Sequence, residues 1–343
     1  MRTLNNDINC IHEHLVIDIA TYVRWLKSEC GVDKVVLLGN SGGGSLFSFY
    51  QSQANTPPAS RIATTPAGEA SGLLDEELVP GDALVFMAAH TGQGLVVSET
   101  IDPAVVDETS PLLTDPSLDM YDPRNGFREP PQWVEYDDEF IVRYRAAQRQ
   151  RVARLDAMAL EMIAAGTSAA EVLDAPGREA LSRETRRRLE VCRAFEPVMV
   201  IYRTMANLNY VDRRLDPSNR SYGSLFGSRP DVMNYRHRGF ARVVTPRAWL
   251  STWSGLSSNA NVMVTAPEGD GAGLVINAGK DRDVYPRTHS RRTFDALGSA
   301  DKDYWEFPGA LHYFEPEHEA DGNRELDALM QHLVPWVAER FPL

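Results

Sequence analysis

The stretch that decides the fold is the segment Val35-Val36-Leu37-Leu38-Gly39-Asn40-Ser41-Gly42-Gly43-Gly44-Ser45-Leu46. Its first four residues are β-branched or aliphatic, which is typical of a short strand that is buried on both faces. Ser41 then stands between Gly39 and Gly43 in the spacing Gly-x-Ser-x-Gly. A sharp turn there needs strained dihedrals and close backbone approach, and we expect a Cβ at either glycine to collide with the neighbouring strand or helix. The segment therefore predicts a strand, a tight turn with a serine at its tip, and a helix that continues over residues 45–56.

A serine at the tip of such a turn is exposed at the carboxyl end of a sheet, where a nucleophile meets its substrate. The N–H of Gly42 lies at the start of the following helix and points to the place where an oxyanion would form. A glycine-rich turn without chemistry has the same spacing, but the strand before it and the helix after it favour a nucleophile. A nucleotide-binding loop is excluded because no Gly-Lys-Ser/Thr sequence follows.

The segment resembles the nucleophile elbow of the α/β-hydrolase superfamily, in which nucleophile, acid and histidine follow one another in this order along the chain. The resemblance covers the beginning and the end of the sequence and leaves its middle unassigned. It implies Asp281 as the acid, in the turn after an apolar strand, with Asp283 as the alternative. It implies His312 as the histidine, in a glycine-containing loop after the last strand, with His318 as the alternative.

In a triad of this kind, His312 takes the proton of Ser41 and returns it to the leaving group, while Asp281 holds the imidazole in the right tautomer. The resemblance implies first the hydrolysis of a small-molecule carboxylic ester through an acyl-enzyme, without a cofactor or a metal ion. The same triad also cleaves amides and carbon–carbon bonds, so these reactions remain alternatives. A further alternative is an incomplete, hydrolase-like protein that serves as a binding or dimerisation module.

The predicted fold is α/β, a partial α/β-hydrolase parallel sheet made of the elbow strand and three following strands, with helices on both faces. The three later strands are expected at Ala83–Ala88, Gly273–Ala278 and Tyr304–Phe307. Before the elbow strand we expect only one helix, over residues 8–30, whereas four strands precede this point in the resembled family. Either the sequence is a fragment or begins in a mis-started reading frame, or the sheet is built differently. The loop that supplies the second oxyanion-hole N–H in the family belongs to the missing part.

The elbow strand should therefore lie at or near an edge of the sheet. An exposed apolar edge strand favours aggregation or pairing with another chain. A homodimer through this strand is the protein–protein contact that we expect.

The sequence is expected to divide into a first core part at residues 1–125, a mostly helical cap at 126–255 and a second core part at 256–343. Two arginine-rich helices are expected near 137–165 and 178–208, with their arginines on solvated faces. Caps of this kind exclude water and shape the substrate pocket. The candidate pocket residues are Asn40, His90, Trp249 and Trp253. The two tryptophans lie four residues apart on one helix face, and for them core packing is the alternative to lining the pocket.

Composition excludes several classes of partner. The 343 residues carry a net charge of −13, which argues against nucleic acid because phosphate binding needs a basic face. No apolar run is long enough to span a bilayer, so we expect no membrane interaction. Three cysteines without metal-site spacing suit a reducing compartment, and we expect the cytoplasm. His12 and His14 do not share a helix face and are expected at the solvated surface.

Overall fold

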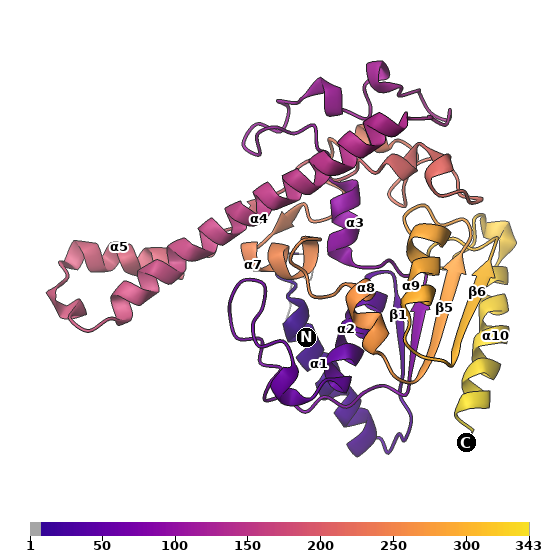
Figure 1. Ribbon diagram of the computed structural model, residues 1–343, viewed down its shortest axis with the longest axis horizontal. Helices are drawn as coiled ribbons and strands as arrows, with labels where there is room; N and C mark the ends of the chain where they lie inside the picture. Colours follow the sequence, from indigo (N-terminus) through magenta and orange to yellow (C-terminus); the bar gives the residue numbers. More distant parts are fainter. Residues whose placement is uncertain (1–7, 343) are drawn as a thin grey trace.

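The structure is a computed structural model that describes residues 8–342. Its centre is a parallel sheet of four strands in the order β1-β2-β5-β6 (Figure 1). One row of paired residues crosses the sheet from Leu38 through Val85 and Leu274 to Asp303. The predicted sheet of the elbow strand and three following strands is therefore confirmed. The strands are β1 (Val36–Asn40), β2 (Ala83–Met87), β5 (Ala272–Ala278) and β6 (Lys302–Phe307).

Helices cover both faces of the sheet because alternate side chains of each strand point to opposite sides. Leu84 and Phe86 of β2 pack in one hydrophobic cluster with residues of α1 and α2. Ala83 and Val85 point the other way, into a cluster that α10 completes with Trp336. Two helical layers therefore enclose the sheet, as predicted. The helices around it are α1 (His12–Ser28), α2 (Gly42–Asn55), α3 (Gln93–Thr100), α8 (Val262–Thr265), α9 (Arg292–Ala296) and α10 (Arg324–Arg340).

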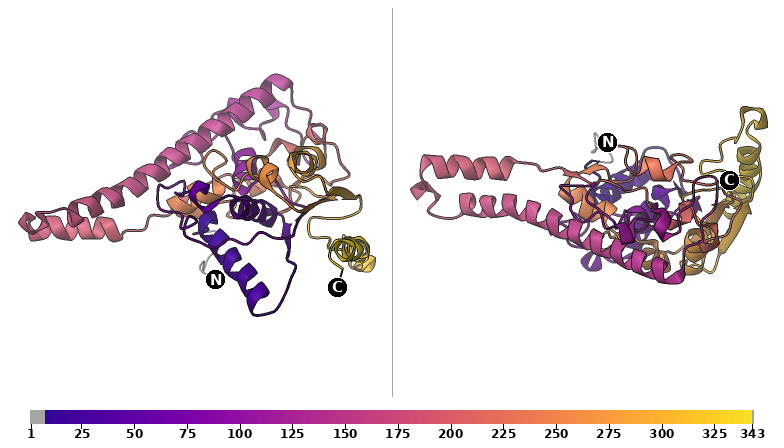
Figure 2. Two further views of the ribbon diagram at one scale, coloured as in Figure 1. Left: turned by 60° about the horizontal axis from the view of Figure 1, so that its bottom comes forward. Right: turned by 90° about the horizontal axis from the view of Figure 1, so that it is seen from above.

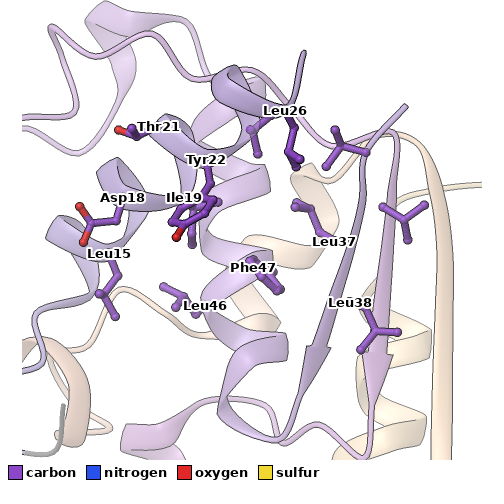
Figure 3. A pocket seen from close by; sticks show the side chains of 13 residues that line it. Leu15, Asp18, Ile19, Thr21, Tyr22, Leu26, Leu37, Leu38, Leu46 and Phe47 are labelled. Carbon is purple, nitrogen blue, oxygen red and sulfur yellow. The ribbon is translucent and has the colours of Figure 1, made fainter. Parts of the chain in front are cut away.

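Strand β1 forms one edge of the sheet, which confirms the prediction for the elbow strand. The carbonyl of Val35 and the N–H of Ser41 bond toward β2, so the alternate residues Val36 and Leu38 direct their backbone groups to the open side. An apolar groove with a volume of about 750 Å³ runs beside this edge, between α1, β1 and α2 (Figure 3). Leu38 is 37% exposed there and Tyr22 of α1 is 69% exposed. Within residues 8–342 no strand pairs with this edge, and the groove beside it is lined mostly by apolar side chains.

A long helical hairpin projects from the body of the molecule (Figures 1 and 2). It consists of α4 (Asp138–Asp174) and α5 (Arg183–Ala194). Side-chain caps begin both helices, since Asp137 accepts the N–H of Phe140 and Ser182 accepts the N–H of Thr185. Helix α4 is longer than expected. Helix α5 is shorter than the expected 178–208, because Pro197 cannot continue a helix.

Beyond α5 the chain forms short elements and irregular segments. Strand β3 (Met199–Val200) pairs in antiparallel orientation with β4 (Val243–Val244). Two further short helices are α6 (Pro230–Met233) and α7 (Pro246–Ala248), and π-helical turns cover Trp249–Trp253 and Pro286–Arg291. Short 3-10 turns occur at Pro58–Ser60, Pro116–Leu118, Pro123–Asn125, Arg178–Ala180, Leu208–Tyr210, Arg213–Leu215, Ala266–Glu268 and Glu319–Asp321. Among the helices of residues 8–342, none combines the length and the apolar composition needed to cross a bilayer.

The sequence predicts that the arginines of the hairpin lie on solvated faces, and this is wrong for one of them. Arg186 and Arg187 of α5 are exposed. Arg151 of α4 is only 1% exposed and binds the Glu108 carboxylate through two nitrogens, at 2.9 Å from Nε and 2.7 Å from Nη2. Its third nitrogen donates to the carbonyl of Asp102. A buried charge is tolerated here because every one of its donor groups is matched.

Candidate active site

The turn between β1 and α2 has the strained geometry expected of a nucleophile elbow. Ser41 has φ 54° and ψ −120°, a backbone conformation that residues with a Cβ adopt rarely. Its N–H donates to the carbonyl of Met87 at 3.2 Å, which fixes the turn to the end of β2. The serine therefore stands at the carboxyl edge of the sheet, where ligands bind in open α/β folds.

Two glycines make this turn possible, but they are not the predicted pair. A Cβ on Gly39 would lie 2.4 Å from the backbone carbon of Gly43, so this position excludes a side chain, as predicted. A Cβ on Gly43 would meet nothing within 4 Å, and the expectation for this residue is wrong. The second crowded position is Gly44, where a Cβ would lie 2.5 Å from Cβ of Ala89. The close approach of α2 to β2 thus depends on Gly44.

Asp281 and His312 form a buried pair at the same edge of the sheet. Nδ1 of His312 donates to Oδ2 of Asp281 at 2.6 Å. Asp281 follows β5 and His312 follows β6, so neighbouring parallel strands bring the two loops together. The other oxygen of the carboxylate accepts the N–H groups of Asp283 and Val284 at 2.9 and 3.0 Å. Three hydrogen bonds therefore hold the orientation of this carboxylate.

The alternative acid, Asp283, has different partners. Its carboxylate accepts the hydroxyl of Tyr210 at 2.7 Å and the N–H of Leu225. Burial raises the pKa of Asp283, although these hydrogen bonds oppose the shift. Asp283 thus ties the acid loop to the segment between α5 and β5, and Asp281 is the carboxylate that bonds His312.

The imidazole of His312 is set up to accept a proton. Burial by itself lowers its pKa, but the Asp281 carboxylate and the hydrogen bond to it outweigh this effect, and the pKa lies above its ordinary value. Because Nδ1 carries the proton shared with Asp281, Nε2 is the basic nitrogen of the neutral ring. Within residues 8–342, this buried Nε2 has no hydrogen-bond partner.

Asn40 connects the serine turn with the histidine loop. Its side-chain amide donates to the carbonyl of His312 at 3.4 Å and to the carbonyl of Met87 at 3.0 Å. The residue before Ser41 is therefore in contact with the backbone of the histidine, although β1 and β6 are opposite edges of the sheet. Serine, acid and histidine loops thus gather at one rim.

The remaining predicted pocket residues are buried in two different places. His90 follows β2 at the same rim, and burial, together with nearby His289, His312 and His12, lowers its pKa to about 3. Trp249 lies in a hydrophobic cluster with residues of α4, and its indole N–H donates to Asp156 at 2.7 Å.

Trp253 belongs to the same cluster as Trp249 and is also buried. The core-packing alternative thus describes the surroundings of both tryptophans.

Sequence reasoning missed three polar side chains near this rim. His12 is 1% exposed rather than at the surface, and its Nε2 lies 2.6 Å from Oε1 of Gln93. Gln93 begins α3 and packs against Gly42. His289 is also buried, and its ring accepts the N–H of Tyr285 at 3.1 Å. The apolar period of α1 gives no signal that its first residue, His12, is buried. The burial of His12 depends on contact with the distant residue Ser251, whose Oγ accepts the N–H of His12.

The described part of the chain contains no cluster of three or more His, Cys, Asp or Glu side chains arranged to hold a metal ion. The same rim holds the Ser41 turn and the hydrogen-bonded pair of His312 and Asp281.

The predicted likeness to the α/β-hydrolase fold is confirmed by this arrangement. The serine turn follows one strand of a parallel sheet, and the acid and histidine loops follow two later strands in that order.

Comparison with known proteins adds little to that assignment. The sequence matches no family model and no curated protein. Among solved structures, VinJ is 13% identical with a TM-score of 0.32, over 93% of this chain and 74% of VinJ. A bromoperoxidase from Bacillus anthracis is 13% identical with a TM-score of 0.28, over 92% of this chain and 72% of that enzyme. The fold assignment therefore rests on the topology and the geometry of this chain.

Proposed function

We propose that the protein is a serine hydrolase of the α/β-hydrolase type, which cleaves a small-molecule carboxylic ester through an acyl-enzyme on Ser41. The observation that carries the proposal is the 2.6 Å bond between His312 and Asp281, made at the rim where the strained Ser41 turn ends. A histidine held in this tautomer, with its other nitrogen unpaired, is what a serine nucleophile needs as its base.

In the first half of the reaction, Oγ of Ser41 attacks the ester carbonyl while Nε2 of His312 accepts its proton. The N–H of Gly42, at the start of α2, donates to the developing oxyanion. The protonated histidine then gives its proton to the leaving alcohol as the carbon–oxygen bond breaks. In the second half, water attacks the acyl carbon while Nε2 of His312 accepts its proton. The bond to Oγ of Ser41 then breaks, His312 returns the proton to Oγ, and the carboxylic acid is released. Asp281 stabilises the imidazolium that forms in each half.

We propose residues 126–255, which include the hairpin of α4 and α5, as the cap over a site between the core parts 1–125 and 256–343. Support comes from the bonds of Asp283 to Tyr210 and Leu225, which join this segment to the acid loop. Asn40 and His90, from two strand ends, are proposed as pocket residues. We propose a cytoplasmic location, because three cysteines without metal-site spacing suit a reducing compartment.

A serine-directed fluorophosphonate probe tests the nucleophile directly. We expect the wild-type protein to be labelled on Ser41, and the Ser41→Ala variant to lose both labelling and turnover. Ser28→Ala, which changes an exposed serine of α1, is the matched control and should behave as wild type. Labelling of wild type and Ser41→Ala to the same extent would remove the serine mechanism.

A substrate panel then distinguishes the bond that is cleaved. Nitrophenyl esters of increasing acyl length test the ester proposal, while anilides and β-diketones test the amide and carbon–carbon alternatives. If the protein is labelled on Ser41 but hydrolyses anilides faster than esters, the triad mechanism stands and the substrate class is an amide instead of an ester.

A further inference from the structure

The side-chain amide of Gln93 lies against the serine turn. A Cβ on Gly42 would come within 2.9 Å of Nε2 of Gln93 and 3.0 Å of its Cδ, so the amide group lies directly over this glycine. Gln93 is the first residue of α3, which follows the loop after β2, and it is partly buried. The absence of a side chain at position 42 is what makes room for the amide.

Its orientation is fixed by His12. The Oε1 atom of Gln93 lies 2.6 Å from Nε2 of His12, and an amide oxygen only accepts hydrogen bonds. Nε2 of His12 therefore carries the proton, and burial lowers the pKa of this histidine, which keeps the ring neutral. With the oxygen directed to His12, the NH₂ group of Gln93 is the end that faces Gly42.

His12 is itself held in place from the other side. Its backbone N–H donates to Oγ of Ser251 at 2.9 Å, and that hydroxyl donates to the buried Glu13 carboxylate at 2.6 Å. A second oxygen of Glu13 accepts the side-chain amide of Asn259 at 2.8 Å. The position of Gln93 is thus determined by a chain of buried polar contacts and not by its own helix alone.

The distances allow Gln93 and Gly42 to share one oxygen atom. A Cβ lies about 2.5 Å from its own backbone nitrogen, so Nε2 of Gln93 is at most about 5.4 Å from the nitrogen of Gly42. Two donors that each bond the same oxygen at about 2.9 Å are separated by no more than about 5.8 Å. An oxygen placed between the two nitrogens is therefore within reach of both.

We infer that the side-chain amide of Gln93 is the second donor of the oxyanion hole, with His12 as the residue that positions it. The inference rests on the proposed function of Ser41. When Oγ of Ser41 bonds the substrate carbon, the π electron pair of the carbonyl moves to its oxygen. That oxygen then accepts hydrogen bonds from the N–H of Gly42 and from Nε2 of Gln93, and it returns the pair when the leaving group departs.

The Gln93→Glu variant provides the main test, because it keeps the shape of the side chain and replaces the donor with a carboxylate. Loss of one oxyanion donor lowers kcat by about 10²- to 10³-fold. With 4-nitrophenyl acetate as the probe, we expect that loss in kcat with KM changed less than threefold. Phenylboronic acid, which forms a tetrahedral adduct with an active serine, should bind more weakly by a similar factor. Gln132→Glu makes the same change at an exposed site and should leave both constants unchanged.

Two further variants separate this role from a structural one. Gly42→Ala keeps the backbone N–H but puts a methyl group against the amide of Gln93, so kcat should fall although Gln93 is still present. His12→Leu removes the partner of Oε1 and should give a smaller loss of kcat, because the amide can then rotate. Each variant is checked by circular dichroism, and Gly42→Ala decides the question if Gln93→Glu does not fold.

The outcomes distinguish this inference from the proposed function. If Ser41→Ala is inactive while Gln93→Glu and Gly42→Ala keep kcat within twofold of wild type, the hydrolase stands and Gln93 is not a donor. If wild type shows neither turnover nor labelling above Ser41→Ala, both proposals are wrong.

Discussion

The most demanding test of the site is the substitution Asp281→Asn, which changes one oxygen to an NH₂ group. Oδ1 of Asp281 accepts two backbone N–H groups, at 2.9 and 3.0 Å, and these donors can only be satisfied by the amide oxygen of the asparagine. The NH₂ group must therefore face Nδ1 of His312, from which the wild-type carboxylate accepts a hydrogen bond at 2.6 Å. The substitution thus forces the imidazole to carry its proton on Nε2.

The magnitude follows from the tautomer. An imidazole with its proton on Nε2 cannot accept the proton of Ser41, and the stabilisation of the imidazolium is lost as well. Such a change of tautomer lowers kcat by about 10⁴-fold in a triad, which corresponds to about 5.4 kcal/mol of transition-state free energy. We expect this loss with little change in KM, since the ester does not touch the carboxylate.

The assay is steady-state hydrolysis of 4-nitrophenyl acetate, with the melting temperature measured on the same preparations. Asp283→Asn is the matched control, because that carboxylate bonds Tyr210 and Leu225 instead of His312. Its kcat should fall tenfold or less. If Asp281→Asn keeps more than a tenth of the wild-type kcat, the pairing of Asp281 with His312 has no part in the reaction.

Three further predictions follow from other features. Because the pKa of His312 is raised, kcat/KM should increase with pH through a midpoint above 6.5, which a pH–rate profile checks. The stabilisation of the fold by the charged pair of His312 and Asp281 is complete below pH 6.5 and is lost as pH rises through the raised pKa, which unfolding midpoints at several pH values check. Leu38→Lys places a charge on the open edge of β1 and should convert the predicted homodimer to monomers in sedimentation velocity; a wild-type protein that is monomeric at all concentrations would contradict pairing through this strand. Gly39→Ala should prevent correct folding, because its Cβ would overlap the backbone of α2. Gly43→Ala should raise the free energy of unfolding by up to about 1 kcal/mol, because its Cβ meets nothing and alanine is the better helix former. Equal effects of the two substitutions on the free energy of unfolding would show that the turn is not crowded at Gly39.

The sheet and the serine turn were predictable because their signals are local. Each strand is a short apolar run, and the spacing of Gly39 and Ser41 specifies a turn by sterics that involve only neighbouring residues. The position of β1 at the edge followed from the order of elements along the chain. Helix α5 was predicted too long at both ends, because Arg178–Ala180 forms a separate 3-10 turn and because Pro197 cannot continue a helix.

The surroundings of the site were harder to predict because they depend on contacts between distant residues. His12 becomes buried only where α1 meets Ser251, and Arg151 only where α4 meets Glu108. The crowding at Gly44 instead of Gly43 depends on which side of α2 faces Ala89. The choice of Asp281 over Asp283 needed the family pattern, since both aspartates follow the same strand. No periodicity or short spacing records such contacts.

The hydrogen bonds of Asp283 to Tyr210 and Leu225 join the acid loop to the segment between α5 and β5. If the segment that carries these two residues moved outward, the buried carboxylate of Asp283 would lose its hydrogen-bond donors, which costs about 1–3 kcal/mol or more for a charged group. We therefore expect this segment to stay attached to the acid loop, and any motion that admits a substrate to involve other parts of the chain.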